Sequence, residues 1–221
     1  MAAVVYSTAT AGTTWSESLA TMGAVAGDRL IIYCHVNASG TFSSTGTDAA
    51  TVFYTDYSQT ETSNHAIAER ILDGTETDIE LTCSAGTATW CPVLLRGTDA
   101  TAAVSGDVAR TYGASGFTHT IAGQTVTVDG SIVAVGGTDG TGVVFSGITN
   151  GYTLLDQNNA GRAGFAAHKA VTTTESAADI SINESNDCTT FSLFVADQSG
   201  TAHTLSPTDT ATATDSIATN I

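Results

Sequence analysis

Positive charge is the scarcest feature of this 221-residue sequence. It contains one lysine, Lys169, and five arginines against 22 acidic residues, which gives a formal net charge of −16. Direct nucleic-acid binding requires a basic face that displaces counterions, and anionic membrane surfaces attract basic segments. We therefore expect neither as a partner. Strong negative charge keeps a particle surface soluble, and it equally suits a salty habitat, where screening weakens self-repulsion.

Proline, charge of either sign and long apolar runs are also sparse. There are two prolines, and charged residues make up 13% of the chain, about half the usual share. No apolar run reaches the 18 residues that span a bilayer, and the first fifteen residues lack the features of a signal peptide. Hydrophobic residues nevertheless make up 42% of the chain, which is ordinary for a globular protein with a real core.

The cysteines are few and leave two alternatives open. They are Cys34, Cys83, Cys91 and Cys188. Cys83 and Cys91 would lie nearly opposite each other in a hairpin folded about residues 86–88, which would allow a cross-strand disulfide. Without an export signal, reduced and buried thiols are the alternative. The spacing C-x7-C without a second pair does not match a structural zinc site.

An internal repeat is the strongest positive signal. Residues 78–99 (DIELTCSAGTATWCPVLLRGTD) align without a gap with residues 179–200 (DISINESNDCTTFSLFVADQSG). The alignment places Trp90 on Phe191 but keeps neither cysteine of the first copy, so the repeat preserves an apolar pattern. Each copy predicts a β-hairpin, and the repeat as a whole predicts a duplicated β-module.

Short runs of β-branched and aromatic residues between turn residues predict an all-β fold. The clearest strands are Arg29–Val36, residues 51–57 and residues 165–171. Residues 65–72 favour a strand over a short helix because of their place in the repeat. We expect a β-sandwich or jelly-roll-like fold built from two sequence-related β-modules. These would form either one composite sandwich or two closely packed lobes.

The expected organisation has five segments. They are an N-terminal arm or edge strand (1–23), a first β-module (24–99), a crossover linker (100–124), a second β-module (125–200) and a C-terminal polar tail (201–221).

Two places in this organisation have alternative interpretations. Residues 14–22 favour a strand, with a helical turn capped by Thr14 and Glu17 as the alternative. Asp129-Gly130 forms a hairpin turn or opens the second module. Residues 136–142 read as a glycine-rich loop.

No group of residues in the sequence indicates a particular reaction. The histidines lie in different predicted elements without ligand spacing, which argues against a metal site: they are His35, His65, His119, His168 and His203. The acidic cluster Asp73, Glu76, Asp78 and Glu80 lacks the D-x-D-x-D-G calcium loop, so a solvated turn is the favoured interpretation. The segment GGTDGTG around Asp139 lacks the lysine of a phosphate loop. Trp15 and Trp90 are predicted to be core residues. We expect no catalytic, cofactor-binding or metal-binding residue.

The order of several short motifs resembles a class of tailed-bacteriophage virion proteins. These motifs are VAGDRLII at residues 25–32, VLLRGT at 93–98, DGSIV at 129–133 and GYTLL at 151–155. Proteins of this class have an "AGD" strand opening, a "GWT" or "GYT" strand and a closing strand rich in small residues. In the first half of this chain, residues 51–57 stand where "GWT" would be. The resemblance implies a β-sandwich without known catalytic residues.

The resemblance implies a structural role in the virion, assembled in the host cytoplasm. We expect a non-enzymatic capsid decoration or cement protein that binds the assembled shell and stabilises it. Its partners would be the major capsid protein or other virion proteins, and it would form a homo-oligomer, with a trimer favoured. The alternative is a glycan- or receptor-binding module of a tail or head fibre, with residues 39–50 and 136–146 as binding loops.

Overall fold

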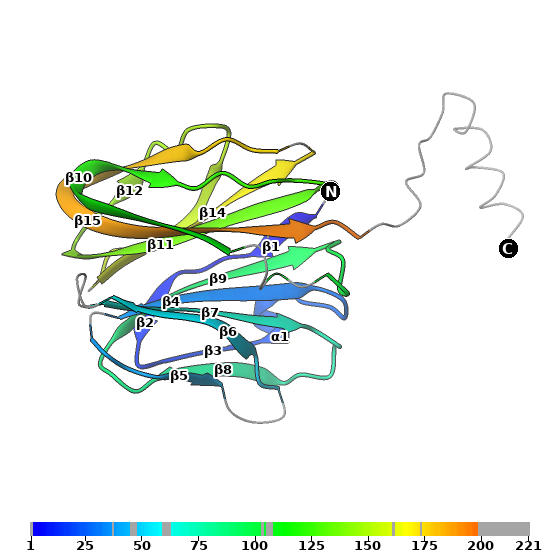
Figure 1. Ribbon diagram of the computed structural model, residues 1–221. Helices are drawn as coiled ribbons and strands as arrows, with labels where there is room; N and C mark the ends of the chain where they lie inside the picture. Colours follow the sequence, from blue (N-terminus) through cyan, green and yellow to red (C-terminus); the bar gives the residue numbers. More distant parts are fainter. Residues whose placement is uncertain are drawn as a thin grey trace, which may run out of the picture.

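The computed structural model describes residues 2–36, 38–44, 48–58, 63–102, 104, 108–160, 162–172 and 174–198. These residues form two β-modules stacked on each other (Figure 1). The predicted all-β, sandwich-like class built from two modules is confirmed. In the described part of the chain, no helix is long and apolar enough to cross a membrane.

The first module consists of a first large sheet and a small sheet. The first large sheet has the strand order β1-β9-β4-β7-β6, with β2 beside β9, and the small sheet has the order β3-β8-β5. A core that contains Trp15 and Trp90 fills the space between them. The elements are β1 (Ala3–Tyr6), β2 (Thr10–Gly12), β3 (Thr14–Ser18), α1 (Leu19–Met22), β4 (Arg29–Val36), β5 (Phe42–Ser44), β6 (Thr51–Ser58), β7 (Ser63–Ile71), β8 (Asp78–Cys83) and β9 (Ala88–Arg96).

The second module is a single bent sheet, the second large sheet. Its order is β10-β15-β11-β14-β13, with β12 beside β15. The first half of β15 pairs with β12 and the second half with β11, so the sheet folds over a core that contains Phe145 and Phe165. The strands are β10 (Val108–Ile121), β11 (Gly130–Thr141), β12 (Phe145–Ser146), β13 (Thr153–Asn158), β14 (Arg162–Val171) and β15 (Ala178–Ala196).

The two large sheets have equivalent topology. The order β1-β9-β4-β7-β6 corresponds strand by strand to β10-β15-β11-β14-β13. The register agrees as well, because Ile31 pairs with Val93 across β4 and β9, and Val133 pairs with Leu193 across β11 and β15. The repeated sequence pattern therefore corresponds to a repeated fold.

The gapless alignment of the repeat holds only in its first part. Leu81 and Ile182 both face the core inside their own module. Trp90 also faces its own core, whereas Phe191 faces the other module. A shift of one residue moves a side chain to the opposite face of a strand, so the second part of the alignment is wrong by one residue. Cys91, rather than Trp90, is equivalent to Phe191.

The two large sheets pack against each other through the same face. The residues between them include Ile31, Val93 and Leu95 from the first sheet and Val133, Leu193 and Val195 from the second. β9 lies against β14, and in the equivalent contact Phe191 on β15 lies against His65 on β7. An approximate two-fold axis therefore relates the modules.

This packing buries β4 on both faces. All eight of its residues are buried, because alternate residues face the small sheet and the second module. A strand that is covered on both sides reads as a nearly continuous apolar run. The segment RLIIYCHV has this pattern, and its β-branched and aromatic residues favour the extended backbone.

Both predicted hairpins are wrong. β8 pairs with β3 and β5, whereas β9 pairs with β1, β2 and β4, so their connection passes from one sheet to another. In the second copy, one continuous strand, β15, replaces the two strands and bends within a single sheet. Turn residues mark where a strand stops, but they do not distinguish a hairpin from a step between sheets.

Two segments predicted as connections are also strands. Residues 100–124 contain β10, which forms an edge of the second large sheet. Most of residues 136–142 continue β11, and the glycines permit close approach: a Cβ on Gly136 would lie 2.7 Å from the Thr189 carbonyl oxygen. Asp129-Gly130 forms no hairpin, because β11 begins at Gly130; it also does not open the second module, because β10 already belongs to that module.

Other sequence predictions are confirmed. Arg29–Val36 is a strand, and residues 65–71 belong to a strand rather than a helix. Residues 14–22 combine both alternatives, because β3 is followed by the short helix α1, whose N-cap is Ser18 instead of Thr14. The C-terminal residues 201–221, including His203, lie outside the described residues.

We predict that Phe191→Ala lowers the free energy of unfolding by about 3–5 kcal/mol, because it removes a buried ring and leaves a cavity. Phe117→Ala is the matched control, since its side chain is 59% exposed and its loss costs less than about 0.5 kcal/mol. Urea unfolding followed by tryptophan fluorescence measures both. Both tryptophans lie in the first module, so an unchanged transition in Phe191→Ala would contradict the packing of the modules.

Candidate functional site

A group of titratable side chains lies at one end of the interface between the modules. Alternate residues of a strand share a face, so β4 directs Tyr33 and His35 toward the second module. β7 places His65 beside His35, its partner in register. Asp139 approaches from β11 of the second module. We call these four residues the interface cluster.

The interface cluster is closely packed. The two imidazole rings stack with centroids 4.7 Å apart and planes inclined by 7°. The Tyr33 hydroxyl and Nδ1 of His65 share a hydrogen bond of 2.8 Å, and Nε2 of His35 lies 3.4 Å from Oδ1 of Asp139. The side chain of His35 is fully buried, whereas that of Asp139 is 19% exposed.

Glycines of the second module make room for these rings. A Cβ added to Gly137 would lie 2.6 Å from Nδ1 of His35 and 2.8 Å from the Tyr33 hydroxyl oxygen. On the other side of the axis, a Cβ on Gly164 would lie 3.3 Å from Sγ of Cys91. The sheets therefore meet through small residues on one side and through aromatic rings on the other.

Arg29 occupies the opposite end of the same face of β4. Its side chain is buried and forms an ion pair with Glu69. It also donates hydrogen bonds to the carbonyl oxygens of Asp99 and Ala102. Burial lowers the pKa of Arg29, and the negative charge of Asp99 opposes this effect. Arg29 thus holds the start of the connection between the modules against the first large sheet.

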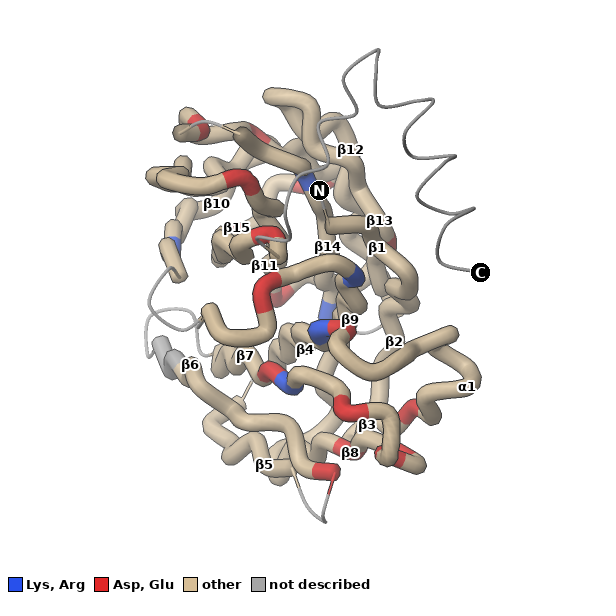
Figure 2. The backbone as a smooth tube through the Cα atoms, turned by 90° about the vertical axis from the view of Figure 1, so that its right-hand side faces the viewer, with Lys and Arg blue, Asp and Glu red and all other residues tan. Residues whose placement is uncertain are grey.

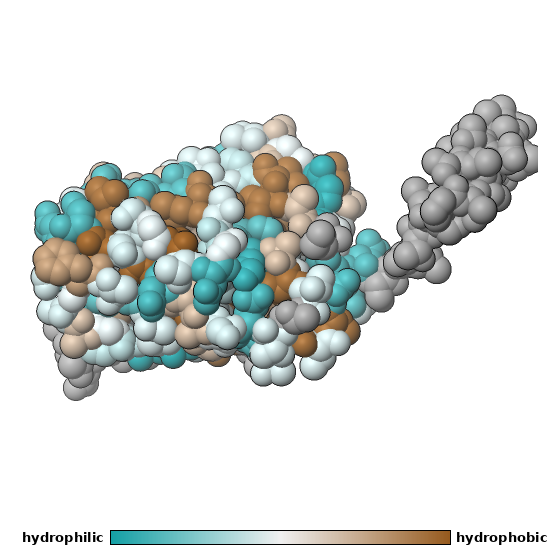
Figure 3. Space-filling model, turned by 90° about the horizontal axis from the view of Figure 1, so that it is seen from above, coloured by the Kyte–Doolittle hydropathy of each residue, from teal (hydrophilic) through white to brown (hydrophobic). Residues whose placement is uncertain are grey.

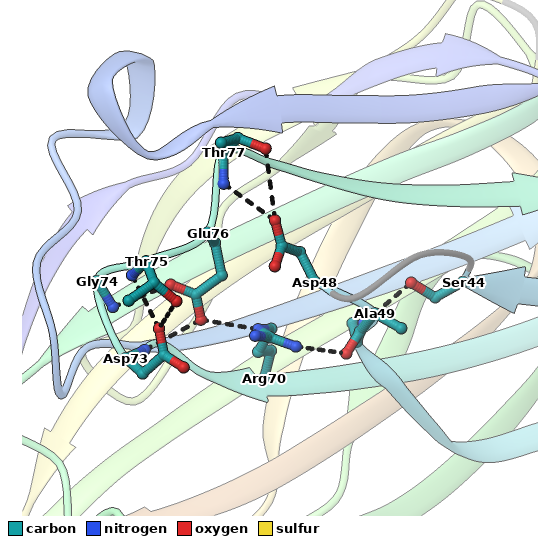
Figure 4. Close-up of polar contacts among 10 residues, drawn as sticks. Ser44, Asp48, Ala49, Arg70, Asp73, Gly74, Thr75, Glu76 and Thr77 are labelled. Carbon is teal, nitrogen blue, oxygen red and sulfur yellow. Dashed lines mark hydrogen bonds and ion pairs between the residues drawn. The ribbon is translucent and has the colours of Figure 1, made fainter.

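The acidic cluster contains a turn, as predicted, but the prediction that it is solvated is wrong for Glu76, whose side chain is buried (Figure 4). The carboxylate of Glu76 accepts hydrogen bonds from the backbone N–H groups of Asp73 and Gly74 at 3.0 Å and from Nε of Arg70 at 2.9 Å. Burial alone would raise the pKa of Glu76, but these hydrogen bonds outweigh it, so the pKa is lowered. Asp78 and Glu80 lie on β8, and the structure does not gather the four carboxylates around one point.

The cysteines are free thiols, so the disulfide alternative is wrong and the reduced alternative is correct. All four are buried. Burial raises the pKa of Cys34 and of Cys91. Because the thiolate is the reactive form, these residues behave as small core residues.

The remaining described histidines stand apart from the interface cluster. His119 is buried on β10, and Nε2 of His168 on β14 lies 3.1 Å from the Ser131 hydroxyl oxygen. Burial lowers the pKa of both imidazoles. Within the described ranges, no three His, Cys, Asp or Glu side chains are grouped so that they could hold a metal ion.

Two of the surface grooves lie away from the interface cluster. One of about 490 Å³ runs between β6, β7 and residues 100–102, and another of about 350 Å³ lies beside Gln198. No member of the interface cluster lines either groove. The arrangement of the cluster supports contact between the modules.

Comparisons of the chain with protein-family models, with curated protein sequences and with solved structures found no match.

No motif in the sequence marks the interface cluster. His35 and His65 are 30 residues apart in the chain and meet only because β4 and β7 pair. The glycines around Asp139 predict a loop, whereas Asp139 lies on β11. The available signal was the alternation within the confident strand Arg29–Val36, which puts Tyr33 and His35 on one face.

We predict that part of the stability is lost as the pH falls below about 6.5. In the unfolded chain His119 and His168 titrate near 6.5, whereas burial lowers both folded pKa values. Below pH 6.5 the unfolded state therefore binds more protons than the folded state. The stabilisation due to these two histidines is complete above pH 6.5 and decreases on acidification. Urea unfolding at pH 7.5 and 5.5 should show a smaller loss for His119→Gln and His168→Gln than for the parent. An equal loss in all three proteins would contradict this assignment.

Proposed function

We propose that this chain is a non-enzymatic structural protein of a tailed-phage virion, a capsid decoration or cement protein that binds the assembled shell. The observation that carries the proposal is the pairing of two equivalent modules through their large sheets. These sheets end in the edge strands β1, β6, β10 and β13. An edge strand can accept a further strand from a neighbour. A protein with exposed sheet edges on several sides is suited to bridging neighbouring subunits.

The charge distribution supports a role at a particle surface. Most of the few cations are used in ion pairs within the fold: Arg29 with Glu69, Arg70 with Glu76, Arg96 with Asp28 and Lys169 with Glu175. The Lys and Arg positions are dispersed among the Asp and Glu positions (Figure 2). The surface is therefore strongly negative, which opposes adhesion to other polyanions.

The outer surface of the second module is mixed in character. Seen from above, its apolar patches are separated by hydrophilic residues (Figure 3). Phe117 and Val144 are exposed apolar side chains of this module. Such small separate patches are ordinary for a protein surface, so contacts through strand edges and polar side chains carry the proposed binding to the shell. The major capsid protein as partner and a trimeric assembly belong to the same proposal.

The glycan-binding alternative has less support. It relied on residues 39–50 and 136–146 as loops, and most of the second segment is strand β11. A glycan array combined with a host-adsorption assay tests this alternative directly.

We predict that virions stripped of this protein lose resistance to heat and to osmotic shock, and that adding the purified protein back restores both. An unrelated protein of similar size and negative charge is the control, and it should restore neither. Survival curves of the stripped and the restored particles measure the effect. Stripped particles with full resistance would overturn the cement role.

A further inference from the structure

His35 is one of several buried side chains in the described residues whose polar atoms are poorly satisfied. The His35 side chain is fully buried, and neither of its ring nitrogens has a hydrogen-bond partner. Its nearest ionic neighbour is Oδ1 of Asp139, 3.4 Å from Nε2, which is longer than an ordinary hydrogen bond. Buried polar atoms are nearly always satisfied, and each exception needs an explanation.

The titratable groups around His35 come from its own strand and from two others. His65 on β7 stacks on the His35 ring, Tyr33 lies on the same face of β4, and Asp139 reaches His35 from β11. His65 is already held by the Tyr33 hydroxyl. Asp139 is the carboxylate that meets His35 across the module interface.

We propose that His35 and Asp139 form a proton-operated clamp between the two modules. In the structure the His35 imidazole faces this carboxylate over a contact of 3.4 Å. On acidification His35 takes up one proton from solvent at a ring nitrogen, and no covalent bond between heavy atoms changes. Nε2–H of the imidazolium then donates a charge-assisted hydrogen bond to Oδ1 of Asp139, and such bonds are shorter and stronger than neutral ones. The clamp joins β4 to β11 directly.

The clamp occurs at only one of the two equivalent positions of the duplicated modules. The position of the second module that is equivalent to His35 is Gly137, which faces His35 and leaves no room for a side chain. Glycine at the equivalent position of the second module thus leaves the space that the His35 ring occupies. Asp139 keeps some exposure, which gives the proton a path from solvent.

A double-mutant cycle at two pH values tests the clamp in the full chain. The proteins are the parent, His35→Gln, Asp139→Asn and the double variant, and urea unfolding is measured at pH 7.5 and 5.5. Both values lie above the range in which aspartates ordinarily titrate. A hydrogen bond to a charged group is stronger than a neutral one, so the coupling between the two positions, read as a ratio of unfolding equilibrium constants, should be about fivefold larger at pH 5.5.

Asp156→Asn is the matched control. Oδ2 of Asp156 also bridges the modules, but it accepts a hydrogen bond of 2.8 Å from the backbone N–H of Ala9, which does not titrate. The effect of Asp156→Asn should be the same at both pH values. If His35→Gln does not fold, Asp139→Asn alone is decisive, because its cost should grow on acidification while that of Asp156→Asn does not. A coupling, or an Asp139→Asn cost, that is equal at the two pH values overturns the clamp. The result does not depend on the proposed virion role.

Discussion

The packing of two equivalent sheet faces is the constraint on which the rest of the structure depends. It buries the second face of β4 and most of β9, so that these strands are covered on both sides. Each fully buried aliphatic or aromatic side chain contributes about 1.5–3 kcal/mol relative to exposure, and the interface contains many of them. Neither large sheet could expose this face to water without a large cost. The two modules are therefore expected to fold as one unit.

The approximate two-fold symmetry also explains where the modules differ. On one side of the axis Cys91 and Gly164 bring the sheets close together, and at the equivalent place the Phe191 ring packs at a tilt against His65 and Tyr33. Large rings on one side are balanced by small residues on the other. Equivalent positions thus differ in size: Phe191 and His65 are large where Cys91 and Gly164 are small. At the two ends of β4, Arg29 binds the start of the connection between the modules and His35 lies next to Asp139 of the second module.

Local patterns predicted many of the strands but not the sheets. Arg29–Val36 was predictable because its apolar run is long and bounded by turn residues. The separation of β8 and β9 into different sheets was not, because pairing is decided by long-range packing. The alignment of Trp90 with Phe191 failed for a related reason, since similarity of residue type carries no information on which face a side chain occupies. The contact between His35, His65 and Asp139 also depends on strand pairing and module packing, so no spacing in the sequence reveals it.

Native-state hydrogen exchange tests the central claim, that the shared face makes the modules one cooperative unit. The account predicts that the most protected amides of β4 and β9 and those of β11 and β15 exchange with the same free energy, equal to that of global unfolding. It also predicts that this equality persists as denaturant is added. A second module whose core amides exchange at a clearly lower free energy, while β4 and β9 stay protected, would contradict it.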